Sequence, residues 1–350
     1  MNTASVAEFD VVIPTVGRPS LDTLLDDLAG AVASSGTSPG RVIVVDDRPQ
    51  SGAPLIRPAA ALENRTVVVR SNGLGPAHAR NTGCQLVQAP WVVFLDDDVR
   101  LPARWVGDLV DDLRACGCGD AASQGRLLVP LPGDRRPTDW ERNVSGLAGA
   151  RYITADFAVR TDVLRSCSGF DERFRHAYRE DTELAIRLLR GGHRIVWGRR
   201  HVEHPVRPAP WWISVSKQSG NEDDALLAVL HGRDWRELVD APRGDRSRHV
   251  TITATAVASL AAAAAGRRFA SLALATACIG SVGHLAWRRI GPGPRTWREV
   301  AAMSATSAAL PFAATYHWSV GRIRWRYAVA KPLPVAPRSP VRTPDHELVP

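Results

Sequence analysis

Short hydrophobic runs recur through the first hundred residues of this chain, and segments with helical spacing separate them. The runs are rich in Val, Ile and Phe and predict four buried strands, over residues 9–13, 42–45, 66–69 and 91–95. Two intervening segments, 21–32 and 77–87, space their apolar residues as an amphipathic helix does. Strands that alternate with helices in this way predict an α/β domain built on a layered sheet.

Polar residues follow directly after each of these strands. They are Pro14-Thr15 with Arg18, Asp46-Asp47, residues 70–72 and residues 96–98. Ligand sites of α/β sheets lie beyond the carboxyl ends of the strands. If the sheet is parallel, all four sets therefore lie at one rim.

The pattern becomes irregular from about residue 120. Three prolines interrupt a polar loop between residues 130 and 137. A helix is predicted over residues 181–190, ended by two glycines, and a short strand over 193–197 follows. A further helix is predicted over residues 222–230.

Three uncharged, alanine-rich stretches dominate the C-terminal part, over residues 250–265, 269–287 and 300–320. A bilayer span needs about 20 apolar residues, so the second and third are long enough and the first is short. Two interpretations stay open. The stretches form either a helical hairpin packed on the rest of the chain or a membrane-associated region.

Charge is distributed unevenly along the chain. Residues 241–350 carry 15 Lys and Arg against 4 Asp and Glu, whereas residues 1–240 carry 29 against 32, within a net charge of +8. A basic region calls for an anionic partner, either nucleic acid or lipid headgroups. Arginines flank the apolar stretches, so we expect a membrane surface and no nucleic acid.

Two groups of carboxylates stand out as candidate chemistry. Asp96, Asp97 and Asp98 end the fourth predicted strand, and their mutual repulsion calls for a divalent cation that carries a phosphate. Glu180 and Asp181 open a helix downstream, where acids also complement the helix dipole. A metal held by oxygens and a separate base would together suit a nucleotide diphosphate substrate.

Six segments within residues 8–205 carry a family resemblance: VVIPTVGRP (11–19), VIVVDD (42–47), GPAHARNTG (75–83), VVFLDDDV (92–99), GFDERF (169–174) and REDTELAIRLLRGG (179–192). In order and spacing they resemble the family 2 glycosyltransferases of the GT-A fold. The resemblance implies a Rossmann-like mixed sheet flanked by helices, followed here by an Ala-rich helical C-terminal region. It also implies an inverting transfer of a sugar from a nucleotide diphosphate donor to a hydroxyl acceptor.

The resemblance carries donor-binding roles over to matching residues. It implies that Pro14, Thr15 and Arg18 line the nucleoside pocket and that Asp46 accepts a hydrogen bond from the base. It further implies that the rest of the donor lies near Arg80, Asn81, Asp96 and Asp97, with Asp97 facing the sugar.

The same resemblance implies a metal site and a catalytic base. Asp96 and Asp98 match the Asp-x-Asp motif, with Asp98 as a direct ligand of Mg²⁺ or Mn²⁺. His204 is expected to complete the metal shell, with His201 as the competing candidate. Asp181 is expected to deprotonate the acceptor, and Glu180 to orient the acceptor or the base.

Two further residues are candidates for the acceptor side. Asp156 falls where the family often contacts the donor sugar or the acceptor. Trp211, next to Trp212, could stack on a sugar ring or anchor the domain at a membrane interface. The acceptor itself is expected to be a cell-envelope glycan or a lipid-linked saccharide.

These expectations divide the chain into three regions: a catalytic domain over residues 1–240, a helical, membrane-associated region over 241–327, and a Pro-rich disordered tail over 328–350. They place the protein at the cytoplasmic face of the membrane, either peripherally or through the C-terminal helices. A sugar nucleotidyltransferase and a non-catalytic nucleotide-sugar-binding protein are the alternatives. The first is disfavoured because the loop after the first strand is poor in glycine.

Overall fold

A seven-stranded mixed sheet forms the centre of the computed structural model, which describes residues 8–50, 55 and 60–334. Its strands are β1 (Phe9–Thr15), β2 (Val42–Asp46), β3 (Thr66–Arg70), β4 (Trp91–Leu95), β5 (Asp120–Leu128), β6 (Asp156–Arg160) and β7 (Arg194–Glu203). They are arranged in the order β3-β2-β1-β4-β6-β5-β7. Strands β1 to β4 are mutually parallel, β6 runs antiparallel to β4 and β5, and β7 is parallel to β5. Six of the seven strands therefore point the same way.

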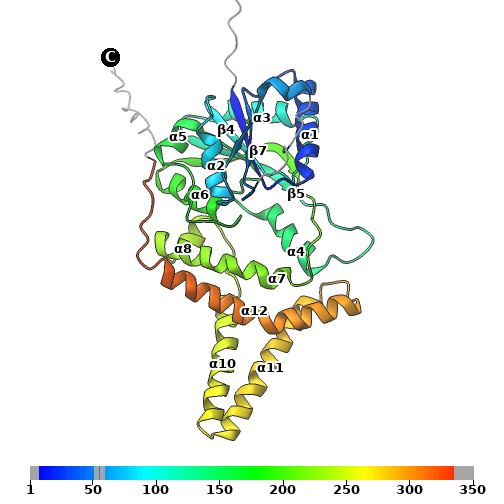
Figure 1. Cartoon of the computed structure of the whole chain (residues 1–350), viewed down its shortest axis with the longest axis vertical. Coiled ribbons are helices and arrows are strands. Elements are labelled where there is room, and N and C mark those ends of the chain that lie inside the picture. Colours follow the sequence, from blue (N-terminus) through cyan, green and yellow to red (C-terminus); the bar gives the residue numbers. More distant parts are fainter. Residues whose placement is uncertain (1–7, 51–54, 56–59, 335–350) are drawn as a thin grey trace, which may run out of the picture.

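Helices cover both faces of this sheet (Figure 1). Because successive side chains of a strand point to opposite faces, Val11 and Ile13 of β1 pack with α1 (Ser20–Ser35) and α3 (Trp105–Ala115). Val12 packs on the other face, with α2 (Pro76–Cys84), α5 (Thr161–Ser166) and α6 (Glu180–Arg190). The arrangement confirms the expected α/β fold with a mixed sheet flanked by helices.

The region expected to be irregular contains two strands of the sheet. β5 reads DAASQGRLL, with small and polar residues in place of a β-branched run, yet seven of its nine residues are buried. β6 is five residues long and lies between β4 and β5. Neither segment shows a strong strand pattern in the sequence, because burial in the middle of the sheet, rather than residue type, makes them strands. The helix α4 (Asp139–Ser145) follows the polar loop.

A third hydrophobic cluster lies beside α6, away from the main core. It joins Phe174 and Ile186 to α8 (Asn221–His231) and α9 (Trp235–Leu238), and Trp325 packs against it. The chain reaches α8 through α7 (Ile213–Ser216) and the short 3₁₀ helix η3 (Lys217–Gly220). This cluster connects the sheet domain to the C-terminal helices.

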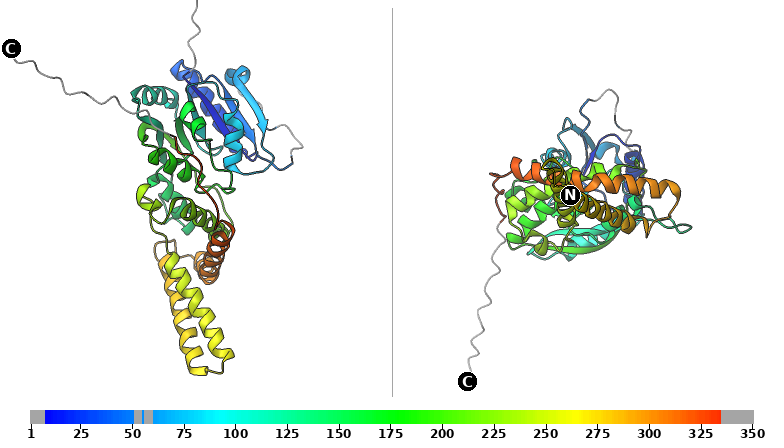
Figure 2. Two further views of the ribbon diagram at one scale, coloured as in Figure 1. Left: turned by 90° about the vertical axis from the view of Figure 1, so that its left-hand side faces the viewer. Right: turned by 90° about the horizontal axis from the view of Figure 1, so that it is seen from below.

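Two C-terminal helices form a hairpin that projects away from the sheet domain (Figures 1 and 2). They are α10 (Arg246–Ala264) and α11 (Arg268–Ile290). Large apolar side chains on both helices are exposed, among them Leu260 at 72%, Phe269 at 91% and Ile279 at 72%. Of the described helices, α11 alone has both the length and the mean hydropathy, 1.6, expected of a membrane span.

The last helix, α12 (Trp297–Arg324), lies across the base of the hairpin (Figure 1). It buries Met303, Leu310 and Ala314 and packs against α7, α8, α10 and α11. A Cβ atom at Gly321 would lie 2.7 Å from the Cα of Glu222, so α12 and α8 touch at the backbone. At 28 residues this helix is long enough to span a bilayer, as predicted for residues 300–320, and in the structure it packs against the neighbouring helices.

The described start of the predicted tail lies against the sheet domain. Arg173 donates a hydrogen bond to the carbonyl of Val329, and Lys331 Nζ donates to the carbonyls of Ser168 and Phe170. The expectation of disorder is therefore wrong for residues 328–334. The remainder of that prediction, over 335–350, lies outside the described residues.

A fully buried charge network joins β5, β6, β7 and α3. Arg200 donates to Asp156 Oδ1 at 2.8 Å and to Asp112 Oδ2 at 3.0 Å, and its remaining nitrogen donates to the carbonyl of Ser123 at 2.7 Å. Trp105 Nε1 donates to Asp156 Oδ2 at 3.0 Å. Buried charges are tolerated when every partner is present, and removal of one partner leaves the others uncompensated.

We expect Arg200→Met to lower the free energy of unfolding by about 3–5 kcal/mol, because it leaves two carboxylates in the core without a cation. Arg199→Met, at the neighbouring exposed position, is the matched control and should change it by less than about 0.5 kcal/mol. Urea unfolding of both variants measures the difference. Equal stabilities for the two variants would contradict this account of the network.

Candidate active site

The carboxyl ends of β4 and β7 bring three possible metal ligands together. The two strands point the same way, so Asp96–Asp98 after β4 and His204 after β7 emerge at one edge of the sheet. An antiparallel bridge holds them in register: Arg100 N donates to the carbonyl of Glu203 at 2.8 Å, and Glu203 N donates back at 3.0 Å. The fold thus joins residues that are about 100 positions apart.

Asp96, Asp98 and His204 form a compact cluster. One ligand atom of each lies within 4.8 Å of the others, and His204 Nε2 is 3.5 Å from Asp98 Oδ1. Burial and the negative charge of Asp96 raise the pKa of Asp98. Arg207 reaches Asp98 Oδ2 at 2.8 Å, and His204 Nδ1 is buried without a hydrogen-bond partner among the described residues. Two carboxylates and an imidazole at this spacing suit a divalent cation.

Arg80, on α2, connects this cluster to the start of α6. Its Nη2 donates to Asp96 Oδ1 at 2.9 Å, and its Nη1 donates to Glu180 Oε1 at 2.8 Å. The guanidinium is almost completely buried and stays charged. The side chain therefore holds the acid after β4 beside the acids of α6.

Glu180 and Asp181 occupy the first turn of α6 and differ in exposure. Glu180 is buried, and burial together with the charge of Asp181 raises its pKa to about 7. Asp181 keeps part of its surface exposed, and burial of the rest raises its pKa as well. Of the two, Asp181 is therefore the carboxylate that a bound molecule can reach, and a carboxylate with a raised pKa suits proton abstraction.

The residue before this pair has an unusual backbone. Arg179 has φ +74°, in the left-handed region that non-glycine residues rarely adopt. Its side chain donates to Asp224 Oδ1 of α8 at 2.8 Å and lies over the rings of Tyr178 and Trp235. These contacts hold the strained residue in position, and the sequence motif does not reveal them.

A second buried network of hydrogen bonds and ion pairs holds α6 in place. Arg187 pairs with Glu183 at 2.7 Å and donates to the carbonyls of Cys167 and Gly169. His231 of α8 lies 3.2 Å from Glu183. Only the tertiary structure brings these groups together, because α8 is about 40 residues downstream.

Asp97, which was expected to face the sugar, is buried and has protein partners for both of its oxygens. It is 2% exposed, and its two oxygens accept hydrogen bonds from Thr15 Oγ1 and Arg18 Nη1, both at 2.6 Å. These contacts connect the ends of β1 and β4. Thr15 and Arg18 therefore lie beside the acidic cluster, while Pro14 remains partly exposed at the end of β1.

The carboxylates after β2 have protein partners. Arg48 donates to both oxygens of Asp46 at 2.9 Å, and this pairing lowers the pKa of Asp46. Asp47 accepts from Ser71 Oγ at 2.7 Å and from the backbone N–H of Gly75 at 3.0 Å. Asp46 can therefore accept a hydrogen bond from a nucleotide base only if its oxygens are shared with Arg48. Asp47 holds the loop that leads into α2.

Asn81 points away from the acidic cluster. Its amide donates to the carbonyl of Phe170 at 3.0 Å and to Glu172 at 2.8 Å, and its oxygen accepts from Phe170 N at 2.8 Å. This amide therefore holds the loop that precedes α6.

The two acceptor-side candidates differ in their surroundings. Asp156 is completely buried in the network with Arg200 and Trp105, so it cannot contact a donor or an acceptor. Trp211 is 56% exposed and packs edge to face with Trp212, on the loop before α7. Both tryptophans line a groove against α12.

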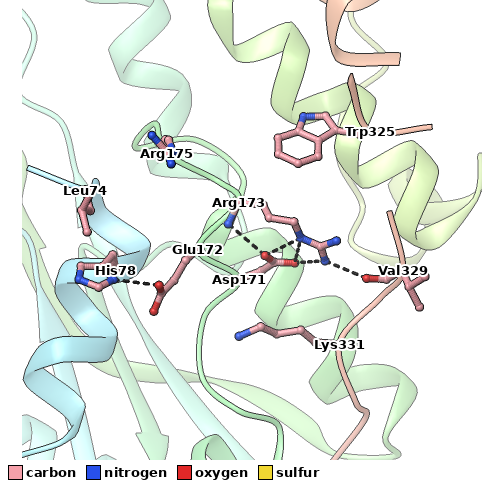
Figure 3. Close-up of a pocket in the computed structure, with 9 residues that line it drawn as sticks. All are labelled: Leu74, His78, Asp171, Glu172, Arg173, Arg175, Trp325, Val329 and Lys331. Atoms are coloured by element: carbon pink, nitrogen blue, oxygen red, sulfur yellow. Dashed lines mark hydrogen bonds and ion pairs between the residues drawn. The ribbon is translucent and has the colours of Figure 1, made fainter. Parts of the chain in front are cut away.

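A cavity of about 740 Å³ lies on another side of α2 (Figure 3). His78 points into it and contacts Glu172 at 2.8 Å, and Lys331 borders it from the C-terminal segment. His78 and Arg80 are two residues apart and so face opposite sides of the helix. The acids of the metal cluster and of α6 do not line this cavity.

The comparisons with known proteins agree with this architecture. Residues 10–141 match the model of the family "Glycosyl transferase family 2". The Pre-mycofactocin glycosyltransferase of Mycobacterium tuberculosis is 29% identical over 249 residues, which cover 65% of this chain and 49% of the relative. The chain thus spans about half the length of the curated relatives it matches.

A solved structure supports the fold independently. It is titled "Mannosyltransferase PcManGT from Pyrobaculum calidifontis in complex with GDP-Man and Mn2+". The match has a TM-score of 0.50 at 17% identity and covers 89% of this chain and 87% of that one. At a sequence identity of 17%, the match supports the fold alone. The family match over residues 10–141, the curated relative and the GT-A-like sheet agree, and they show that this chain is similar to the family 2 glycosyltransferases.

Proposed function

We propose that this protein transfers a sugar, with inversion, from a nucleoside diphosphate donor to a hydroxyl acceptor, and that a divalent cation assists the reaction. The observation that carries the proposal is the meeting of Asp96, Asp98 and His204 with Arg80, Glu180 and Asp181 at one edge of the sheet. This edge offers carboxylates that can bind a cation and an accessible carboxylate that can accept a proton.

The donor atoms of the cluster fit a divalent cation. Asp96 and Asp98 repel each other, and His204 has a buried nitrogen without a partner among the described residues. Carboxylates suit Mg²⁺ and Mn²⁺, and an added imidazole favours Mn²⁺ over Mg²⁺. When bound, such an ion neutralises the charge that develops on a departing diphosphate.

Inversion requires one displacement at the anomeric carbon. The acceptor oxygen forms the new bond to that carbon, the bond to the diphosphate breaks, and the nucleoside diphosphate leaves with the electron pair. In the proposal, Asp181 takes the acceptor proton, and Glu180 stays bound to Arg80 and holds the first turn of α6 in position. Thr15, Arg18 and Asp46 lie along the same edge and are our candidates for the nucleoside side.

We further propose that the catalytic part, residues 1–240, works at a membrane surface through the region 241–327. α11 is 23 residues long, or about 35 Å, enough to cross a hydrocarbon core of about 30 Å. Arg289, in its last turn, contacts Asp139 at 2.7 Å and Ser214 at 2.9 Å, which attaches the base of the hairpin to the catalytic part. A hairpin returns the chain to its starting side, and we infer that this side is the cytoplasmic one.

His204→Ala should weaken Mn²⁺-dependent nucleotide binding at least about tenfold, since the loss of even an outer partner of a bound metal costs about that much. The measurement is the thermal shift produced by UDP, GDP or dTDP with Mn²⁺ and then with a chelator. His201→Ala, three residues earlier in β7, is the matched control and should behave as wild type. Equal effects from both variants would exclude His204 as a ligand.

Asp181→Asn should retain nucleotide binding yet reduce kcat by about 10²–10⁴, because an amide cannot accept the acceptor proton. Turnover is measured with the nucleotide sugar whose nucleotide gives the largest thermal shift. Asp26→Asn, on the exposed side of α1, controls for the removal of one charge. Unchanged kcat in Asp181→Asn would assign the base to another group.

Ile279→Asp, near the centre of α11, should release the protein from lipid vesicles, because a carboxylate at mid-bilayer costs about 3 kcal/mol. Flotation with phosphatidylcholine and phosphatidylglycerol vesicles measures the bound fraction. Leu131→Asp, at an exposed loop position of the catalytic part, is the control and should float as wild type does. If both variants float equally, the hairpin is not inserted.

A further inference from the structure

An apolar groove of about 370 Å³ runs between the α7 region and α12. One wall consists of Trp211, Trp212 and Val215. The other is an alanine face of α12, with Ala305, Ala309 and Ala313 four residues apart and therefore on one side of the helix. Figure 1 shows α7 directly alongside α12, with the hairpin beyond. The volume falls within the range of small-molecule sites.

The groove is connected to the metal cluster by a short piece of chain. Arg207 reaches Asp98 at 2.8 Å, and its carbonyl accepts a hydrogen bond from Trp140 Nε1 at 2.8 Å. Trp211 follows four residues later, so its Cα lies at most about 14 Å from that of Arg207. A molecule of modest length in the groove can therefore reach the edge of the active site.

Cations border the groove at this end. Lys217 directly follows Ser216, a lining residue, and its side-chain ammonium has no ion pair or hydrogen bond within the described ranges. Partial loss of water and the positive charges of Arg207 and Arg18 lower its pKa. Three cations thus lie within electrostatic reach of one another, and Lys217 has no counter-charge. This arrangement complements an anion.

We propose that this groove holds the hydrocarbon chain of a lipid-linked acceptor, with its phosphate between Lys217 and Arg207 and the hydroxyl that receives the sugar on the far side of that phosphate. The inference rests on the proposed function and names the acceptor class for that same active site. A hydrocarbon chain matches tryptophan and alanine walls that offer few hydrogen bonds, and a phosphate supplies the missing negative charge.

A lipid also agrees with where the groove lies. α12 packs against the base of the exposed α10–α11 hairpin, so a bilayer around that hairpin would bring its surface to α12 and the tryptophan pair. Tryptophan is enriched at such interfaces. A soluble sugar would leave the apolar walls in contact with water, whereas a lipid can enter the groove directly from the bilayer.

The test uses the full chain in phosphatidylcholine vesicles and two photoreactive probes with a terminal diazirine, a dodecyl phosphate and the matching dodecanol. Cross-linked residues are identified by mass spectrometry. We expect the phosphate probe to label α7 and α12 at the groove, and Ala309→Trp, which fills it, to reduce this labelling about tenfold or more. Ala308→Trp, on an exposed face of α12 outside the groove, should label as wild type does. Ala313→Phe provides a second filling variant, and unchanged thermal unfolding shows that each variant is folded.

The head-group contact has its own readout. Lys217→Gln should reduce labelling by the phosphate probe about tenfold and leave labelling by the alcohol unchanged, because only the phosphate forms a charge-assisted contact. If Lys217→Gln instead weakens nucleoside diphosphate binding to the same extent, Lys217 belongs to the donor site and the proposed head-group contact is overturned.

The remaining outcomes separate this inference from the function it rests on. Equal labelling of Ala309→Trp and Ala308→Trp, or labelling confined to α10 and α11, overturns the groove as a lipid site. Transfer of sugar to a soluble acceptor without groove labelling also overturns it and leaves the proposed function intact. Groove labelling in a protein that transfers no sugar from any nucleotide donor supports the lipid site and overturns the proposed function.

Discussion

The structure of the active-site edge depends on one buried guanidinium. Arg80 bridges Asp96 after β4 and Glu180 of α6, and without its charge these acids and their neighbours would repel one another at short range. The bridge lies on α2, whose start is positioned by Asp47 through the loop before it. The end of β4 and the helices α2 and α6 therefore share one electrostatic contact, and Asp181, beside it, keeps part of its surface exposed.

Further contacts extend this arrangement toward the C-terminal helices. The strained backbone of Arg179 is held by Asp224 of α8, and α8 packs at backbone distance on α12 through Gly321. α12 in turn contacts both helices of the hairpin. The first turn of α6 is thus connected through packed helices to the part of the chain that faces the proposed membrane, so the acceptor side of the site and the membrane side form one structure.

Much of the fold was predictable, because its signals are local. The first four strands are β-branched runs, and their predicted ranges agree with β1 to β4 to within two residues. β5 and β6 were missed because small and polar residues become strands there only through burial beside Arg200. The same limit applies to several candidate site residues. Asp97, Asp156 and Asn81 have the types that a binding site needs, but their orientation depends on distant partners.

The sequence by itself determined the first four strands with α1 and α2 between them, the acids that follow β4 and open α6, and the apolar character of the hairpin, since residue type and spacing carry these features. Only the tertiary structure decided that His204 joins Asp96 and Asp98, that Arg80 connects the two acid groups, and that α12 packs on α7 and α8. The physical reason is that these features depend on contacts between strand ends and helix faces that are 100 or more residues apart in the sequence. No local pattern encodes such contacts.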